Sequence, residues 1–226
     1  MSVPPQYGET WVYESIVGAL PGVDLSEPQA VALQLGLFEA AVLVFGWYYR
    51  LPGAVLAGTV AVGVAAAGSV AMLRFSRETR GVPLPDPYRR LLFGSSIEVV
   101  LAVLAFVALV THVFVFDPRL FGDLFGTDPP VVVVYLTLLV LWDLCYRIGT
   151  SWWAAVVSLW RSLRYRFDAE AAGRLRRADG INVAFAATQV VLLPFLDGQP
   201  VLQVAVAGHV VAVGVVSGAA ILLLDG

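Results

Sequence analysis

Five polar side chains lie inside long apolar stretches of this sequence, where they could do chemistry: Glu39, Asp143, Arg147, Gln189 and His209. An ionisable group within a membrane costs several kcal/mol unless it is paired or hydrated, so such residues mark functional sites or internal polar contacts. Asp143 and Arg147 are four residues apart, which places the acid and the base on one face of a helix. Glu39 has no basic residue within one helical turn, so we expect its partner to come from another helix.

These residues have two interpretations. Glu39, Asp143 and His209 lie roughly 15, 20 and 12 Å from the outer ends of their predicted helices, which is the middle of a membrane. With Arg147 and Gln189, they could line a path for protons, cations or a small solute. Alternatively, Asp143 and Arg147 form a desolvated ion pair that clamps one helix against a neighbour. The first interpretation predicts a small transporter or channel, and the second predicts a non-catalytic component.

Other chemistries lack the residues that they need. The sequence contains no lysine, so neither a lysine Schiff base nor a lysine-containing phosphate loop can form. One cysteine, Cys145, and two histidines make up no recognisable metal or catalytic motif. His112 and His209 could be axial haem ligands, but their predicted depths differ by about 6 Å. We therefore predict no enzymatic activity, no metal, and no haem or other cofactor.

The composition indicates that lipid surrounds the elements that position these residues. Hydrophobic residues make up 59% of the 226 residues, charged residues make up 14%, and the mean hydropathy is +0.81. Runs of about 20 apolar residues, which cross a hydrocarbon layer of about 30 Å, predict an all-α polytopic transmembrane helical bundle. The six predicted spanning helices cover residues 27–49, 51–73, 95–116, 130–153, 181–196 and 201–224.

Flanking segments are predicted to lie at the membrane surface. Residues 1–26 form an N-terminal interfacial segment, and residues 27–226 form a single transmembrane domain with short interfacial helices in its loops. Residues 154–166 are expected to continue the fourth helix into the interface. Ser95 to Glu98 match a capping box at the start of the third helix, which makes Glu98 a capping residue.

Arginines are concentrated in two loops, between helices two and three and between helices four and five. Basic residues near helix ends are retained on the cytoplasmic side, so both loops and both termini are predicted to be cytoplasmic in the plasma membrane. Eight of these arginines are expected to contact anionic lipid headgroups: Arg74, Arg77, Arg89, Arg90, Arg161, Arg164, Arg176 and Arg177.

Small residues suggest how the helices pack. Ala57, Ala61, Ala65 and Ser69 recur every four residues in the second helix, and the sixth contains a GxxxG pair, which lets other helices approach closely. These stripes are expected to pack against each other or against partner chains. We favour a membrane scaffold or accessory subunit because few polar groups lie within the spans. The expected partners are lipids and either further copies of the chain or other membrane subunits, with no nucleic acid.

Two segments carry a resemblance to a known family. Residues 88–98 contain the run YRRLLFGSSIE, and residues 141–153 contain LWDLCYRIGTSWW. Over most of its length the chain resembles an uncharacterised multipass membrane protein family of halophilic archaea, and the absence of lysine beside abundant valine, alanine and aspartate looks haloarchaeal as well. The resemblance implies a membrane location and this topology, and it brings no activity, cofactor or catalytic residue.

Overall fold

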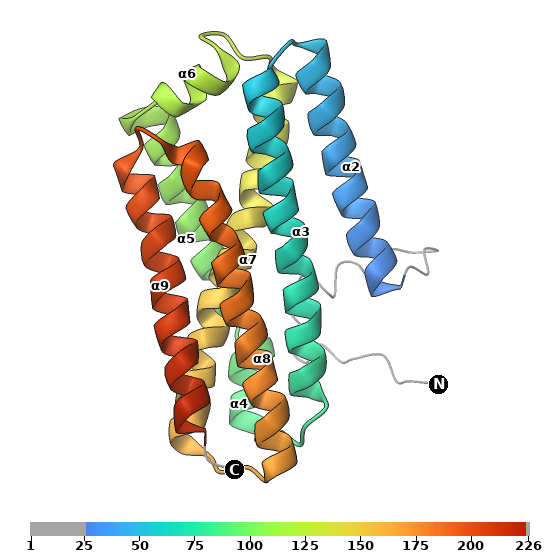
Figure 1. Cartoon of the computed structure of the whole chain (residues 1–226), viewed down its shortest axis with the longest axis vertical. Helices are drawn as coiled ribbons and strands as arrows, with labels where there is room; N and C mark the ends of the chain where they lie inside the picture. The colour runs from blue at the N-terminus through green and yellow to red at the C-terminus, as the bar shows by residue number, and fades with distance from the viewer. Residues whose placement is uncertain (1–25, 225–226) are drawn as a thin grey trace.

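The chain folds into a long bundle of helices. A computed structural model describes residues 26–224, and within this range every regular element is a helix, which confirms the predicted all-α class (Figure 1). The elements are α2 (Glu27–Tyr48), α3 (Pro52–Arg80), α4 (Asp86–Phe93), α5 (Ile97–Thr111), the π-helix η1 (His112–Phe116), α6 (Arg119–Phe125), α7 (Val131–Arg164), α8 (Ala169–Thr188), the 3₁₀-helix η2 (Gln189–Leu196) and α9 (Pro200–Leu223). The predicted interfacial segment 1–26 falls almost entirely outside the described residues.

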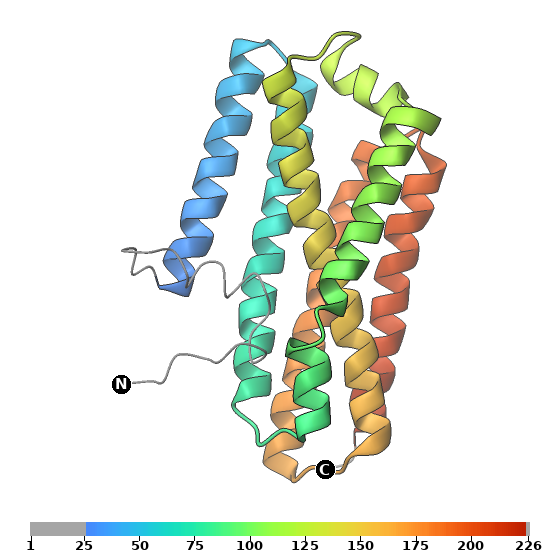
Figure 2. The same ribbon diagram turned by 180° about the vertical axis from the view of Figure 1, so that it is seen from behind.

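Within residues 26–224, six helices are long and apolar enough to cross a membrane, which is the predicted number. They cover Pro28–Tyr48, Pro52–Arg80, Asp86–Phe116, Val131–Arg164, Ala169–Leu196 and Pro200–Leu223. The first of these spans is α2. It is shorter than its neighbours and starts about halfway along the bundle (Figures 1 and 2). The chain is therefore a multipass membrane protein.

Two predicted helix ends differ at the arginine-rich end of the bundle. α3 continues beyond residue 73 to Arg80, and α8 begins at Ala169 and not at residue 181. α7 continues beyond residue 153 to Arg164, in line with the predicted continuation of the fourth helix. Several side chains of residues 154–164 are buried, so other helices pack around this continuation. The 34 residues of α7 extend about 51 Å, so this end projects well beyond a hydrocarbon layer of about 30 Å.

The third span is interrupted near its start. α4 ends at Phe93, α5 begins at Ile97, and Ser96 between them adopts a left-handed conformation with φ 55°. The predicted capping box does not form, because Ser96 and not Ser95 precedes the first turn of α5 and its side chain makes no capping hydrogen bond. The Ser95 hydroxyl donates to the Leu91 carbonyl at 2.8 Å. Glu98 is fully buried, and within residues 26–224 neither carboxylate oxygen has a hydrogen-bond partner.

α7 lies at the centre of the bundle. It packs against α3, α5, α8 and α9, whereas α2 packs mainly against α3 at one edge (Figure 2). The small residues of α3 and α9 serve different interfaces. Gly58 lets Val42 of α2 approach α3, whereas added Cβ atoms at Gly214 and Gly218 of α9 would meet nothing within 4 Å in the described chain.

Candidate functional site

The charged pair within the apolar part of α7 is confirmed. Arg147 donates through Nη2 to Asp143 Oδ1 at 2.8 Å and through Nε to Oδ2 at 3.2 Å, a two-point contact. The Arg147 side chain is 0% exposed and the Asp143 side chain is 14% exposed. The other guanidinium nitrogen, Nη1, lies 3.7 Å from the sulfur of Met72 on α3. The pair therefore joins α7 to α3 and neutralises its own charge.

A glycine on α3 makes room for this arginine. A Cβ added at Gly68 would lie 2.5 Å from Arg147 Cδ and 2.8 Å from the Phe185 ring of α8. Real side chains do not tolerate such distances, so three helices meet closely only because position 68 carries no side chain. Arg147 is held by packing as well as by its charge.

Glu39 has the interhelical partner that the sequence led us to expect. The Thr59 hydroxyl of α3 donates to Glu39 Oε1 at 2.8 Å. Asp143 instead lines a small hollow with Gln34 of α2 and Ala66 of α3. Because Ala66 is seven residues beyond Thr59 along α3, about 10 Å, Glu39 and Asp143 do not share one site.

Gln189 and His209 lie on a different interface. Asn182 donates to Ser217 at 3.2 Å, and Ala186 belongs to the same packed cluster as Val213. α8 and α9 are antiparallel, so the next turn after Ala186 lies beside the turn before Val213. Gln189 is therefore at the same level of the bundle as His209. Gln189 is fully buried, and within residues 26–224 neither its amide atoms nor His209 Nε2 has a hydrogen-bond partner. The predicted cluster is thus distributed over the α2–α3, α3–α7 and α8–α9 interfaces.

The most deeply buried ion pair was not predicted. Arg161 of α7 donates to Asp179 of α8 at 2.6 Å, and both side chains are at most 1% exposed. The guanidinium also donates to the Tyr88 hydroxyl of α4 at 3.3 Å, and it lies 5.6 Å from the centre of that ring. Arg161 was expected to contact lipid headgroups, and this prediction is wrong. An acid at position 179, two residues after Arg177, was the available signal for a partner in the fold.

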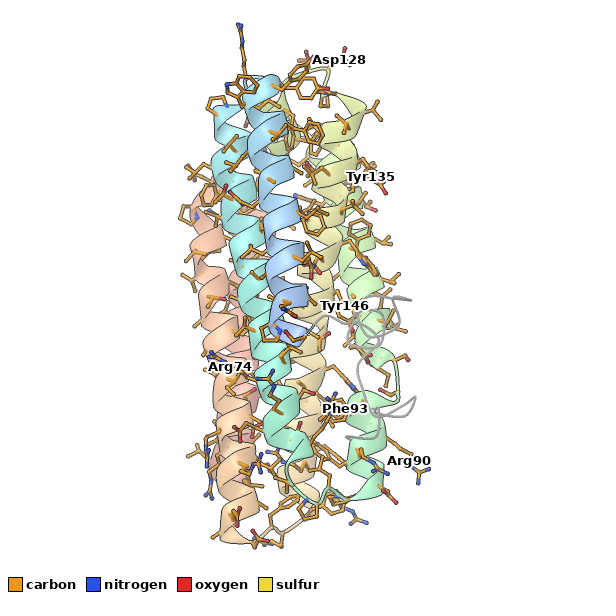
Figure 3. The ribbon with its side chains drawn as sticks, turned by 90° about the vertical axis from the view of Figure 1, so that its right-hand side faces the viewer. Arg74, Arg90, Phe93, Asp128, Tyr135 and Tyr146 are labelled. Atoms are coloured by element: carbon orange, nitrogen blue, oxygen red, sulfur yellow. The ribbon has the colours of Figure 1, made fainter. Side chains whose placement is uncertain are left out.

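The other seven arginines of that set have exposed or partly exposed side chains at the arginine-rich end, where Figure 3 shows Arg74 and Arg90.

Neutral hydrogen bonds add to the polar contacts between α7, α8 and α9. The Ser151 hydroxyl donates to the Asn182 carbonyl oxygen at 2.8 Å, and the Ser162 hydroxyl donates to the Ala220 carbonyl at 2.8 Å. These contacts tie three helices together near the end of the predicted fourth span and beyond it.

The two histidines are separated along the bundle. His112 Nε2 lies 3.3 Å from Gln199 Oε1, at the start of α9. His209 is ten residues farther along α9, about 15 Å away. No group of three His, Cys, Asp or Glu side chains gathers within residues 26–224 in a way that could hold a metal ion.

The loop helix α6 follows an ion pair outside the spans. Arg119 Nε donates to Asp117 Oδ1 at 2.7 Å, and this hydrogen bond lowers the pKa of the Asp117 carboxyl well below its ordinary value. Asp117 precedes α6, and Arg119 is its first residue. α6 is a short helix in a loop, of the kind that the sequence predicts.

Taken together, the charges of Glu39, Asp143 and Arg147 are bonded within the chain, whereas the buried Glu98 has no hydrogen-bond partner within residues 26–224. Asp143 is bonded to Arg147 and Glu39 is bonded to Thr59. The hollow beside Asp143 has a volume of about 10 Å³, which is room for about one water molecule. The arrangement is suited to holding helices together, because partner groups satisfy the charges and little space adjoins them.

Comparison with known proteins places the chain in a family. A family model described as a family of unknown function, DUF7530, matches residues 6–220. No curated protein and no solved structure matches the chain. The match agrees with the resemblance to an uncharacterised family and carries no activity. The chain belongs to the DUF7530 family of unknown function.

Proposed function

We propose that this protein is a non-catalytic membrane scaffold or accessory subunit. The observation that carries the proposal is the pairing of Arg147 with Asp143, packed over Gly68. A residue that passes ions or protons along a path needs alternative partners or water, whereas Arg147 is enclosed by Met72 and Phe185. The pair serves as a clamp between α7, α3 and α8.

The proposed orientation places the arginine-rich end in the cytoplasm. The support is the asymmetry of the loops, because the loops at the α6 end contain two arginines, Arg50 and Arg119, and Arg119 is paired with Asp117. Both termini are then cytoplasmic, the membrane is the plasma membrane, and the source is a halophilic archaeon. Lipids and either further copies or other membrane subunits are the proposed partners.

A small transporter or channel is the second candidate. It is favoured by Gln189 and His209, whose buried polar atoms lack partners within residues 26–224, at the point where α8 changes into the 3₁₀-helix η2. Mid-helix changes of this kind often mark hinges. Transport would therefore follow the α8–α9 interface, and Glu39 and the Asp143–Arg147 pair would lie off the path.

Proton flux in proteoliposomes separates the two candidates. The full-length protein is reconstituted with a trapped pH-sensitive dye, and a pH gradient is imposed across the vesicle membrane. The scaffold proposal expects that vesicles with the wild type, Glu39→Gln or His209→Ala lose the pH gradient no faster than vesicles without protein. A protein-dependent flux that one of these substitutions abolishes, while the protein stays folded, would contradict it.

A further inference from the structure

An apolar cavity lies at the opposite end of the bundle from the arginines. Its volume is about 130 Å³, and α2, α3, α6 and α7 form its walls. Every lining side chain is apolar except Thr137, and the Thr137 hydroxyl donates to the Val133 carbonyl of its own helix at 2.8 Å. The walls therefore offer no free hydrogen-bond donor to a polar guest.

The size and lining of this cavity select a hydrocarbon occupant. An apolar cavity of about 150 Å³ stays free of water and takes up a molecule the size of benzene. Water gains no hydrogen bonds from alanine, valine, leucine and phenylalanine walls, whereas an apolar guest gains dispersion contacts on all sides. A segment of a hydrocarbon chain meets both requirements.

The cavity lies at the depth of one membrane leaflet. Trp47 and Tyr48, which are strongly exposed at the end of α2, are residues of the kind that mark a membrane interface. The cavity wall on α3 runs from Leu51 to Ala61, about 15 Å, which is half of a hydrocarbon layer of about 30 Å. A chain from the leaflet on the α6 side can reach this depth.

The cavity borders the outer surface of α7 and is limited at both ends. Lining side chains on both α2 and α7 are partly exposed, among them Phe45, Leu136 and Leu141, so the cavity reaches the surface between these helices. α6 forms the roof through Phe125. At the other end, Val140 separates the cavity from the hollow of about 10 Å³ beside Asp143, which is too narrow for a chain.

We infer that this cavity binds one hydrocarbon chain of a bilayer lipid, which enters from the leaflet on the α6 side and ends before the Asp143–Arg147 pair. The hydrocarbon chain of the lipid fills the space between α2 and α7, so it attaches the peripheral helix α2 to the rest of the bundle. The inference is independent of whether the protein is a scaffold or a transporter.

Photocrosslinking tests this inference. The full-length protein is reconstituted in phosphatidylglycerol vesicles that contain a lipid with a diazirine on its acyl chain, and labelled residues are mapped by mass spectrometry after illumination. The expected labels concentrate on the α6 roof and the α7 wall, at Phe125, Leu136 and their neighbours, in excess of labels on the exposed face of α9.

Filling the cavity provides the matched comparison. Ala57 lines the cavity and Ala205 is exposed on α9. Ala57→Phe should reduce labelling of the cavity wall several-fold, and Ala205→Phe should leave it unchanged. Wild-type labels spread equally over the cavity wall and the α9 face would overturn the inference whether or not Ala57→Phe folds. Crosslinks from a second copy of the chain at the cavity wall, in place of lipid, would also overturn it.

Discussion

Arg147 of α7 crosses Gly68 of α3 so closely that a Cβ at position 68 would lie 2.5 Å from Arg147 Cδ. The closeness explains why a charged side chain in an apolar bundle is 0% exposed. Gly68 admits the aliphatic part of Arg147, Asp143 accepts its hydrogen bonds, and Phe185 covers it from α8. Packing and charge thus act on the same side chain.

Gly68→Ala should destabilise the protein, because the added methyl group overlaps Arg147 and the Phe185 ring. Overpacking of this kind costs about 1–3 kcal/mol. Gly63→Ala in the same helix is the control, since a Cβ there meets nothing within 4 Å in the described chain. Thermal unfolding in detergent should give a lower midpoint for Gly68→Ala only. Equal midpoints for the two variants would show that position 68 is not crowded.

Arg161→Gln should be far more harmful than Arg164→Gln. The first substitution leaves Asp179 buried without its partner, whereas the Arg164 side chain is exposed one turn away. Breaking a buried ion pair costs about 3–5 kcal/mol, and an exposed arginine contributes about 0–1 kcal/mol. The yield of monodisperse protein and its unfolding midpoint measure the difference. Similar losses for both variants would mean that Arg161 acts only as a surface charge.

Thr59→Val should cost about 1 kcal/mol, because it removes the hydroxyl that donates to Glu39 while keeping the shape of the side chain. Glu39→Gln should be nearly silent, since the amide oxygen still accepts that hydrogen bond. Chemical unfolding of both variants in the same detergent provides the comparison. A large loss for Glu39→Gln with no loss for Thr59→Val would assign Glu39 to a different partner.

Cysteine labelling tests the proposed orientation. The native Cys145 is buried, so labelling of a new cysteine at an exposed loop position can be distinguished from labelling of Cys145. In intact cells, a membrane-impermeant maleimide should label Asp128→Cys at the α6 end and should not label Arg90→Cys at the arginine-rich end. Permeabilised cells should label both variants. The reverse pattern in intact cells would invert the topology.

The sequence predicts the number of spans well because a run of about 20 apolar residues has no other stable arrangement in lipid. The ion pair of Asp143 with Arg147 was also predictable, since four-residue spacing is a property of one helix. The continuation of the fourth helix beyond residue 153 was predicted as well, whereas the early start of α8 at Ala169 was not. Arg161 and Asp179 look like surface charges in the sequence, and only the packing of α4 and α8 around them makes them internal.

Contacts between helices were the other gap in the prediction. An acid at position 39 requires a partner, but apolar composition does not encode which turn of α3 faces α2, so Thr59 was not foreseen. For the same reason, the residues of the proposed cluster, Glu39, Asp143, Gln189 and His209, lie on different interfaces. Depth follows from counting residues along one helix, whereas adjacency depends on how helices rotate and pack.

A double-mutant cycle on Asp143 and Arg147 tests most directly whether the intramembrane charges are clamps. Unfolding free energies are measured for the wild type, Asp143→Asn, Arg147→Met and the double variant. A clamp predicts that each single change leaves an uncompensated group and costs about 3–5 kcal/mol, whereas the double variant loses much less than the sum. Losses that simply add would contradict the clamp, because they would show that Asp143 and Arg147 stabilise the bundle independently of each other.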